Sequence, residues 1–422
     1  MIKSLIRQSS VVLLFKLFGS ANAFFLTILI TNGLGANASG GFFFVISILA
    51  FLTSITTFGL PVGLVNLLPK SLSKNNDDVF KVVVSSIIMV LFFSGVVILG
   101  LFLVEPFVGN KIITDYKFEI LLSLIPFALL IILSSVFQSL EKVSFAMLML
   151  NVLYQAILTG IIVILRPNTL LLVLDYFIIS LWVSLVVGFC YFFWCFRKCM
   201  KYYFDLNHLL FLVGFASTFM ITNSLGQFSN FWISYNLSIF SNTDSIAVFS
   251  VAVRIALIIS LVSFALNKVT AQKISTLANV DDRKKLYRII SVSVLIVFLV
   301  VSPILLVSLL FPDKVLVLFG EEFVSGTLIL SVIMVGQYFA SITGVNSFVL
   351  QMTGSQSVMK NIAISSLSIS ILISYFAIST YGLLGAALSY SFNLCLIGTL
   401  SSLYVYKLTG YNIFKFLTYI SK

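Results

Sequence analysis

Apolar runs of about 20 residues recur along the whole chain, and they constrain its fold more than any other feature. A helix of about 20 apolar residues is long enough to cross the ~30 Å hydrocarbon core of a bilayer. Charged residues make up only 9% of the 422 residues, whereas soluble globular proteins carry about 25%. The sequence lacks the alternating segments of about 10 residues that mark a transmembrane barrel. The pattern therefore predicts an all-α, polytopic membrane protein.

We expect about twelve spanning helices, and we expect the N-terminal stretch to be retained as the first of them. That stretch resembles a signal peptide, but Lys16 interrupts its apolar core and the apolar run continues to Ile30. Twelve spans divide into two six-helix lobes, residues 1–203 and residues 204–422, with a basic connection between them. The expected spans are residues 8–31, 41–67, 80–104, 118–139, 144–165, 169–195, 207–238, 244–267, 287–311, 326–352, 358–380 and 383–406.

The two predicted lobes contain similar passages. GGFFFVISILAFL at 40–52 and IAVFSVAVRIALI at 246–258 can be aligned so that Phe43 matches Phe249 and Val45 matches Val251. Both passages are expected to run inward from the outer side. The sequence therefore indicates a parallel internal repeat, whose axis lies along the membrane normal.

The distribution of cations predicts the orientation of the chain. Nineteen of the 25 Lys and Arg residues lie in connections on the side of the N-terminus, and four lie on the other side. Because cytoplasmic connections carry the excess of Lys and Arg, both termini are expected in the cytoplasm. The net charge of +11 is explained by this topology, and we expect no nucleic-acid partner.

The longest connection on the predicted cytoplasmic side, residues 268–289, is strongly basic. It has two interpretations of equal weight. In one it lies along the membrane surface against anionic lipid, and in the other it is only a topology signal. Membrane lipids are thus an expected partner.

Two cations lie inside predicted spans. Arg254 interrupts VFSVAVRIALIISLV (248–262), about ten residues or about 15 Å into its span, and Lys16 is about as deep in the first span. A charge at the bilayer centre costs about 2.5–3.5 kcal/mol on insertion scales and usually marks a transport pathway. Alternatives are an ion pair between Arg254 and Asp175, the one acid within a span, or snorkelling, which suits Lys16 better than Arg254.

Neutral polar side chains accompany these cations. Some are expected to form ordinary interhelical hydrogen bonds, worth about 0.6 kcal/mol on average, and as a set they are suited to line a hydrated site for sugar hydroxyls. The candidates for substrate binding are Lys16, Arg254, Asn22, Gln155, Gln227 and Asn346. The other members of the set are Gln138, Asn151, Asn223, Asn230, Gln337, Gln351 and Asn393.

The sequence TFGLPVG places Gly59 and Gly63 on either side of Pro61. Proline inside a helix removes a hydrogen bond and predicts a kink. The two glycines permit close helix contact. Packing is the favoured interpretation, and a hinge for a conformational change is the alternative.

No catalytic constellation is present, and there is no Walker motif for nucleotide. Cys190, Cys195 and Cys199 cluster near a membrane edge, but they and His208 lack the spacing of a zinc site. We expect free membrane cysteines, no metal and no cofactor.

Several passages, in this order, resemble the Wzx-type polysaccharide or O-antigen flippases of the multidrug/oligosaccharidyl-lipid/polysaccharide (MOP) exporter superfamily. The resemblance covers nearly the whole chain. The passages are GLGANASGGFFFVISILAFLTSITTFGLPVGLVNLLPK (33–70), AVFSVAVRIALII (247–259), FGEEFVSGTLIL (319–330), SITGVNSFVLQMTGSQ (341–356) and YGLLGAALSYSFN (381–393).

This resemblance implies two six-helix lobes around a central cavity. It implies that an undecaprenyl-pyrophosphate-linked oligosaccharide repeat moves from the cytoplasmic to the outer leaflet. Lys16 and Arg254 match positions where cations of relatives are thought to hold the anionic substrate. Many relatives carry an acid late in the seventh span, where this chain reads NFWISYNLS (230–238). Sodium or proton coupling is therefore open, with Asp175 as the candidate residue.

Two alternative functions follow from the same composition. A drug antiporter of the superfamily would need an acidic cavity, whereas the intramembrane charges here are mostly cationic. A membrane glycan polymerase or ligase would need a large outer loop with catalytic side chains, and no predicted outer loop is long enough. A polymerase and its chain-length machinery are instead candidate partners.

Overall fold

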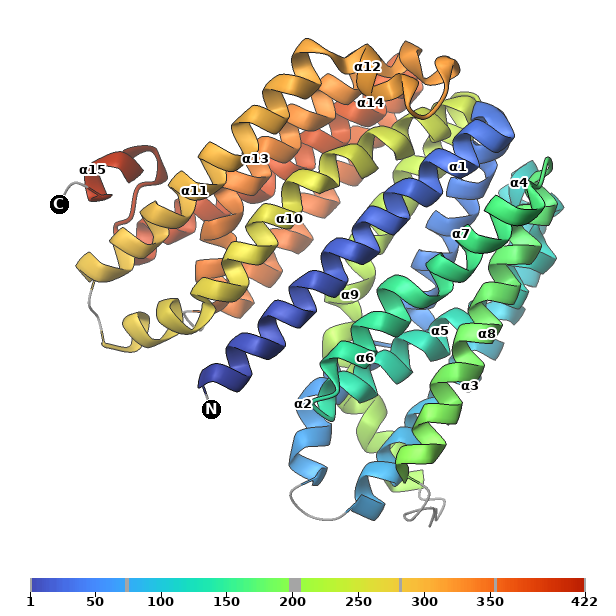
Figure 1. The fold of residues 1–422 in the computed structure, drawn as a ribbon, viewed down its shortest axis with the longest axis horizontal. Coiled ribbons are helices and arrows are strands. Elements are labelled where there is room, and N and C mark those ends of the chain that lie inside the picture. The colour runs from blue at the N-terminus through green and yellow to red at the C-terminus, as the bar shows by residue number, and fades with distance from the viewer. Residues whose placement is uncertain (1, 73–75, 197–205, 281–282, 353–354, 421–422) are drawn as a thin grey trace. The chain divides into compact units, whose positions relative to one another are not determined.

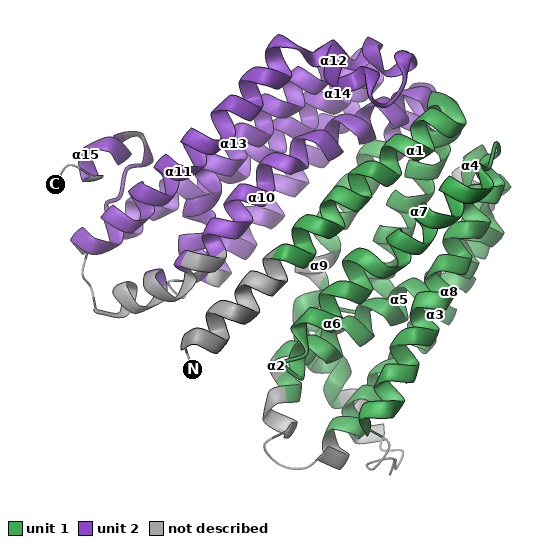
Figure 2. Cartoon of the chain, in the orientation of Figure 1, with its two compact units in different colours: residues 1–234 green, residues 235–422 purple. Residues whose placement is uncertain are grey.

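A computed structural model describes residues 2–72, 76–196, 206–280, 283–352 and 355–420, and every element in these ranges is helical (Figure 1). Nine helices in the described ranges are long and apolar enough to cross a membrane. The predicted fold class, an all-α polytopic membrane protein, is confirmed. The chain forms two compact units, residues Met1–Ser234 and Tyr235–Lys422 (Figure 2).

The first unit holds the helices from the N-terminus through most of α9. A π-helical turn, η1, joins α6 to α7 without a break. In chain order the elements are α1 (Ile2–Thr56), α2 (Leu60–Leu72), α3 (Asn76–Val108), α4 (Lys111–Asp115), α5 (Lys117–Ser139), α6 (Val143–Leu148), η1 (Met149–Leu153), α7 (Tyr154–Leu165), α8 (Leu170–Phe196) and α9 (Leu206–Phe240).

The second unit begins near the end of α9 and contains the remaining helices. Its last two elements form a short segment that follows α14. In chain order the elements are α10 (Thr243–Val280), α11 (Arg283–Leu310), α12 (Pro312–Val317), η2 (Glu321–Gly326), α13 (Thr327–Met352), α14 (Gln356–Thr409), η3 (Ile413–Lys415) and α15 (Phe416–Ile420).

The twelve expected spans all fall on these helices, but some boundaries differ. α1 contains the first expected span and part of the second, with a single non-helical residue, Gly35, between them. α14 contains the last two, with its break at Gly382. Both glycines have positive φ, 73° and 54°, a conformation that costs glycine little. The turns expected at 32–40 and 381–382 are thus reduced to one-residue breaks.

The first unit is built around α5. In its most apolar 18-residue stretch α5 is 72% buried, whereas α3 is only 17% buried. Among the buried serines of α5, Ser134 links this helix to α6, because its hydroxyl donates to the Ala146 carbonyl oxygen at 3.0 Å. On α3, Leu99 and Leu103 are 65% and 72% exposed. α3 therefore presents an apolar face suited to lipid.

In the second unit α13 and α14 pack most closely. A Cβ on Gly398 would lie 2.2 Å from Oγ1 of Thr343, and a Cβ on Gly336 would lie 2.6 Å from Cβ of Ser391. Contacts this short allow only glycine. Small residues at such positions let the helix backbones approach and gain dispersion energy where no hydrophobic effect drives association.

The position of α9 bears on the division of the chain. We predicted lobes of residues 1–203 and 204–422, whereas the compact units meet after residue 234. α9 contacts the second half of α1: the Phe51 ring stacks on Phe231 at 5.1 Å, and the Ser224 hydroxyl donates to the Ser54 carbonyl oxygen at 3.4 Å. The predicted boundary between residues 203 and 204 concerns the duplication of the sequence, and it stays a prediction.

Candidate functional site

A polar seam joins α1 to η1 and α7 within the first unit. The Gln155 side-chain amide, in the orientation that satisfies its neighbours, donates to the carbonyl oxygens of Gly19 at 3.3 Å and Asn151 at 3.0 Å. One turn further along, the Thr159 hydroxyl donates to Oδ1 of Asn22 at 3.4 Å. The structure thus brings Asn22 and Gln155, two predicted binding residues, to the same helix–helix contact.

Gly19 makes this seam possible. A Cβ at this position would lie 2.6 Å from the backbone oxygen of Asn151, so only glycine allows α1 to approach so closely. Asn151 belongs to the π-helical turn η1. Turns of this kind insert one residue into a helix and occur often at functional sites. The Gln155 amide therefore links α1 to this irregular turn, through the carbonyl oxygens of Gly19 and Asn151.

The seam has an unused hydrogen-bond donor. Nδ2 of Asn22 is buried and has no hydrogen-bond partner among the described residues. A buried amide without a partner costs about 1–3 kcal/mol, so the position favours an acceptor such as a water or a ligand hydroxyl. Lys16, half-buried, lies six residues before Asn22 on α1, about 9 Å along the axis. An ammonium group and free amide capacity on one helix suit a ligand with both anionic and hydroxyl oxygens.

Arg254 lies on α10 in the second unit. Ala252 and Ala256 on the packed side of α10 are fully buried, whereas Leu257 and Ile258 are 45% and 38% exposed. The 3.6-residue period places Arg254 with the exposed pair, and its side chain is half-buried. Val251, one turn before Arg254, is fully buried, so Arg254 lies at the border between the packed and the exposed sides of α10.

Asn346 occupies a second polar seam, between α13 and α14. It is fully buried, and Nδ2 donates to the Ser402 hydroxyl at 3.0 Å. Beside it, the Ser347 hydroxyl donates to Ser401 at 2.9 Å. Oδ1 of Asn346 is buried without a partner among the described residues. These contacts are the interhelical hydrogen bonds that the sequence left as the alternative to substrate binding.

Gln227 and Asp175 are half-buried on α9 and α8 of the first unit. Asp175 and Arg254, considered above as an ion pair, belong to different units. The side chains of Asn223 and His208 and the whole of Cys199 lie outside the described residues. The described cysteines, Cys190, Cys195 and Cys395, are free. Within the described residues no group of three or more His, Cys, Asp or Glu side chains is arranged to hold a metal ion.

We expected Pro61 to kink a helix at TFGLPVG. The helix does break there, but Pro61 is not the cause, so this expectation was wrong. Pro61 is the second residue of α2, where a missing N–H breaks no helical hydrogen bond. The break comes from Phe58 and Gly59, whose φ values are 48° and 74°. A Cβ on Gly59 would lie 2.5 Å from the carbonyl oxygen of Ala216. The close approach to α9 supports the packing interpretation. Gly63 supports it too, because a Cβ there would lie 3.4 Å from the ring of Phe215.

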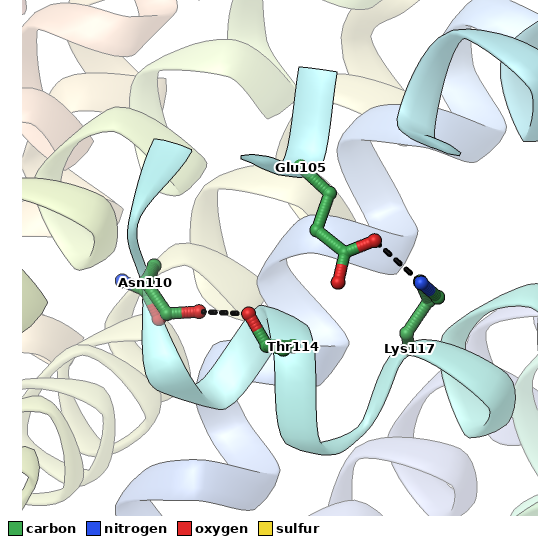
Figure 3. Close-up of polar contacts among 4 residues, drawn as sticks. All are labelled: Glu105, Asn110, Thr114 and Lys117. Carbon is green, nitrogen blue, oxygen red and sulfur yellow. Dashed lines mark hydrogen bonds and ion pairs between the residues drawn. The ribbon is translucent and has the colours of Figure 1, made fainter. Parts of the chain in front are cut away.

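Two charged contacts were missed by the sequence analysis. Glu105 at the end of α3 and Lys117 at the start of α5 form an ion pair at 2.5 Å, with side chains 13% and 18% exposed (Figure 3). Asn110 caps α4 between them, accepting from the backbone N–H of Ile112 at 3.0 Å. The sequence did contain a sign of this ion pair, because Glu105 and Lys117 lie at opposite ends of one short connection. This pair ties together the ends of neighbouring helices.

The second contact joins the α5–α6 connection to α8. Nζ of Lys142 lies 2.8 Å from Sγ of Cys195 and 4.9 Å from the centre of the Tyr191 ring. Burial alone would lower the pKa of Lys142, but its contacts with Cys195 and Tyr191 outweigh burial and raise the pKa. Lys142 is therefore a charged residue that links the α5–α6 connection to α8. From the sequence, it was counted only among the cations of the cytoplasmic connections.

Comparison with known proteins places this chain in a family. Residues 5–271 match the family described as polysaccharide biosynthesis protein. A putative O-antigen transporter of Shigella flexneri is 25% identical over 187 residues. That match covers 44% of this chain and 44% of the relative, so it spans less than half the length of either protein.

Solved structures share the fold at low identity. An inward-facing multidrug resistance MATE family transporter of the MOP superfamily has a TM-score of 0.75 at 14% identity, over 95% of this chain and 98% of that one. The lipid II flippase MurJ, in an inward closed conformation, has a TM-score of 0.71 at 15% identity, over 97% and 89%. At these identities the likeness establishes the fold alone.

Proposed function

The chain belongs to the polysaccharide biosynthesis protein family, and from that premise we propose that it is a flippase for a lipid-linked oligosaccharide. The cargo is an undecaprenyl-pyrophosphate-linked repeat of O-antigen or capsule type. It moves from the cytoplasmic to the outer leaflet of the bacterial inner membrane by alternating access. The partial match to a putative O-antigen transporter supports this cargo, and the positive-inside pattern supports cytoplasmic termini.

The observation that carries the proposal is the polar seam of α1 and α7. It brings the amides of Asn22 and Gln155 together on helices that are otherwise apolar, and the cation Lys16 lies six residues before Asn22 on α1. Polar side chains within spanning helices are costly and tend to mark substrate pathways. A sugar repeat on a pyrophosphate needs both amide partners for hydroxyls and cations for phosphate, and α1 carries both in Asn22 and Lys16.

Arg254 is the second cation of the proposal. A guanidinium can bind phosphate through two parallel hydrogen bonds, and it stays charged at any physiological pH. Its half-buried side chain lies at the border between the packed and the exposed sides of α10. An anion moving outward also follows the inside-negative potential. Two charges at 100 mV would contribute about 4.6 kcal/mol, at about 2.3 kcal/mol per charge.

No metal or organic cofactor enters this mechanism. Asp175 is the candidate for sodium or proton coupling, and a glycan polymerase with its chain-length machinery is a candidate partner that would consume the flipped repeat. The drug antiporter gains no support from the MATE structures, because their likeness at 14% identity concerns the fold alone.

The test is a deletion strain that makes a surface glycan. We expect loss of surface glycan and accumulation of single lipid-linked repeats that stay inaccessible to a glycosidase added outside spheroplasts. Repeats that accumulate on the outer leaflet would point to a polymerase or ligase instead. An unchanged glycan with altered drug resistance would favour the antiporter.

A further inference from the structure

The C-terminal segment, residues 410–420, turns back from α14 and packs against α11 in the second unit (Figure 1). Gly410 permits the turn, because its φ of 83° is unfavourable for other residues. A Cβ there would also lie 3.0 Å from the Tyr287 hydroxyl. That hydroxyl donates to the carbonyl oxygen of Thr409. The chain is thus turned tightly against the first turns of α11.

Three tyrosines hold the segment in place. The ring of Tyr287 on α11 lies 5.5 Å from Tyr411 and 5.2 Å from Tyr419, and the latter two are 5.3 Å apart. Tyr411 is fully buried, and its hydroxyl lies 3.0 Å from that of Ser291. Burial raises the pKa of Tyr411 to about 12, so it stays a neutral hydrogen-bonding group. The segment is therefore a docked part of the fold.

Cationic residues adjoin this contact on both of its sides, and all of them are exposed. Residues 283–290 and 405–420 contain no Asp or Glu. Asp281 and Asp282, which precede α11, lie outside the described residues. The exposed cations are Lys284, Lys285 and Arg288 on α11, Lys407 in the last turn of α14, and Lys415 in η3. We call these five residues the basic cluster.

An exposed apolar surface continues from the basic cluster along α11. Phe416 of the segment lies 6.3 Å from Phe298, ring to ring. Next to Phe298, Leu299 is 59% exposed, and on α15 Leu417 is 61% exposed. The part of α11 that begins at Lys284 is long and apolar enough to span a membrane. Cations at the end of such a helix, followed by apolar surface, match a ligand with an anionic head and an acyl tail.

We propose that the docked C-terminal segment and the first turns of α11 together bind the headgroup of an anionic phospholipid on the predicted cytoplasmic side. The phosphate lies among the basic cluster, and an acyl chain follows the exposed face of α11 beside Leu299. A free phosphate would use the cations alone, so the apolar surface favours lipid. The tyrosine contacts make the site composite, because they bring Lys407 and Lys415 to the same end of the unit as Arg288.

Native mass spectrometry of the full chain in mild detergent tests this inference. Phosphatidylglycerol and phosphatidylcholine with the same acyl chains are titrated, and we expect a preference for phosphatidylglycerol of about tenfold or more. Two variants are expected to lose it. K284Q/K285Q/R288Q removes three charges, each worth about fivefold. F416A/Y419A keeps every cation but undocks the segment.

Lys360→Gln is the matched control, since Lys360 is another exposed cation of α14 on the predicted cytoplasmic side, and it should leave the preference unchanged. A preference that survives F416A/Y419A would overturn the composite site. If that variant does not fold, the comparison of Arg288→Gln with Lys360→Gln decides, and equal losses would overturn the proposal. Competition by millimolar inorganic phosphate would likewise mean a free-anion site.

Discussion

At the scale of single residues, the sequence could identify which polar side chains are costly but not what each contacts. Asn22 and Asn346 are equivalent in sequence terms, since each is an amide inside an apolar run. Each makes one contact with another helix, but among the described residues the buried atom left without a partner is the donor Nδ2 in Asn22 and the acceptor Oδ1 in Asn346. The difference depends on helices far apart in sequence, and no local pattern contains it.

Asn22→Ala tests the role of the free amide donor. Its contact with Thr159 is long, at 3.4 Å, so its loss should cost no more than the ~0.6 kcal/mol typical of such bonds in membranes. We expect a nearly unchanged thermal midpoint in detergent but a several-fold loss of surface glycan at equal membrane level. The matched control is Asn32→Ala, because Asn32 is exposed on the same helix. Wild-type glycan from Asn22→Ala would remove Asn22 from the site.

The ion pair of Glu105 and Lys117 can be measured by a double-mutant cycle. The pair is short and only 13% and 18% exposed, and Lys117 also lies 4.7 Å from the centre of the Phe102 ring. Exposed pairs contribute about 0–1 kcal/mol, so we expect a coupling free energy of about 1 kcal/mol or more from Glu105→Gln, Lys117→Met and the double variant. A coupling near zero would mean that the pair is as weakly coupled as a surface contact.

At the scale of elements, apolar runs predicted where the helices lie but not how neighbouring helices connect. Gly35 and Gly382 were expected within ordinary turns, yet each is a one-residue break between helical arms. The π-helical turn η1 left no recognisable signal in its own residues, MLNVL. The aligned passages of the proposed repeat do agree in burial, since Phe43 and Phe249 are both buried.

Gly19→Ala tests the fit between α1 and η1. The added Cβ would lie 2.6 Å from the Asn151 backbone oxygen, and overpacking of this kind costs about 1–3 kcal/mol. We expect a lower thermal midpoint and reduced glycan export. Gly33→Ala is the control on the same helix, because nothing lies within 4 Å of its added Cβ. Equal midpoints for the two variants would contradict the close contact at Gly19.

At the scale of the whole molecule, composition alone was sufficient for the fold class, and ordered passages of sequence were sufficient for the family. Composition could not assign α9 to either unit, because nothing in the composition of a helix indicates which unit it packs on. Only tertiary contacts, such as Phe51 on Phe231, place most of it with the first unit.

Cysteine cross-linking tests that assignment. In a background without native cysteines, Ser54→Cys paired with Ser224→Cys should form a disulfide under mild oxidation, because these residues touch. Ser54→Cys paired with Ser217→Cys should not, since Ser217 lies two turns away on α9. Cross-linking of the second pair but not the first would show a different register for α9.

The central claim, outward movement of a lipid-linked anion by a site on α1, is tested most directly in vesicles. The full chain is reconstituted with a fluorescent undecaprenyl-pyrophosphate oligosaccharide, and a membrane-impermeant quencher reports the leaflet. We predict protein-dependent exchange between leaflets that Lys16→Met slows at least about tenfold, about 1.4 kcal/mol, and that Lys16→Arg largely retains. Exchange at the wild-type rate in Lys16→Met, or none with the unchanged protein, would contradict the account.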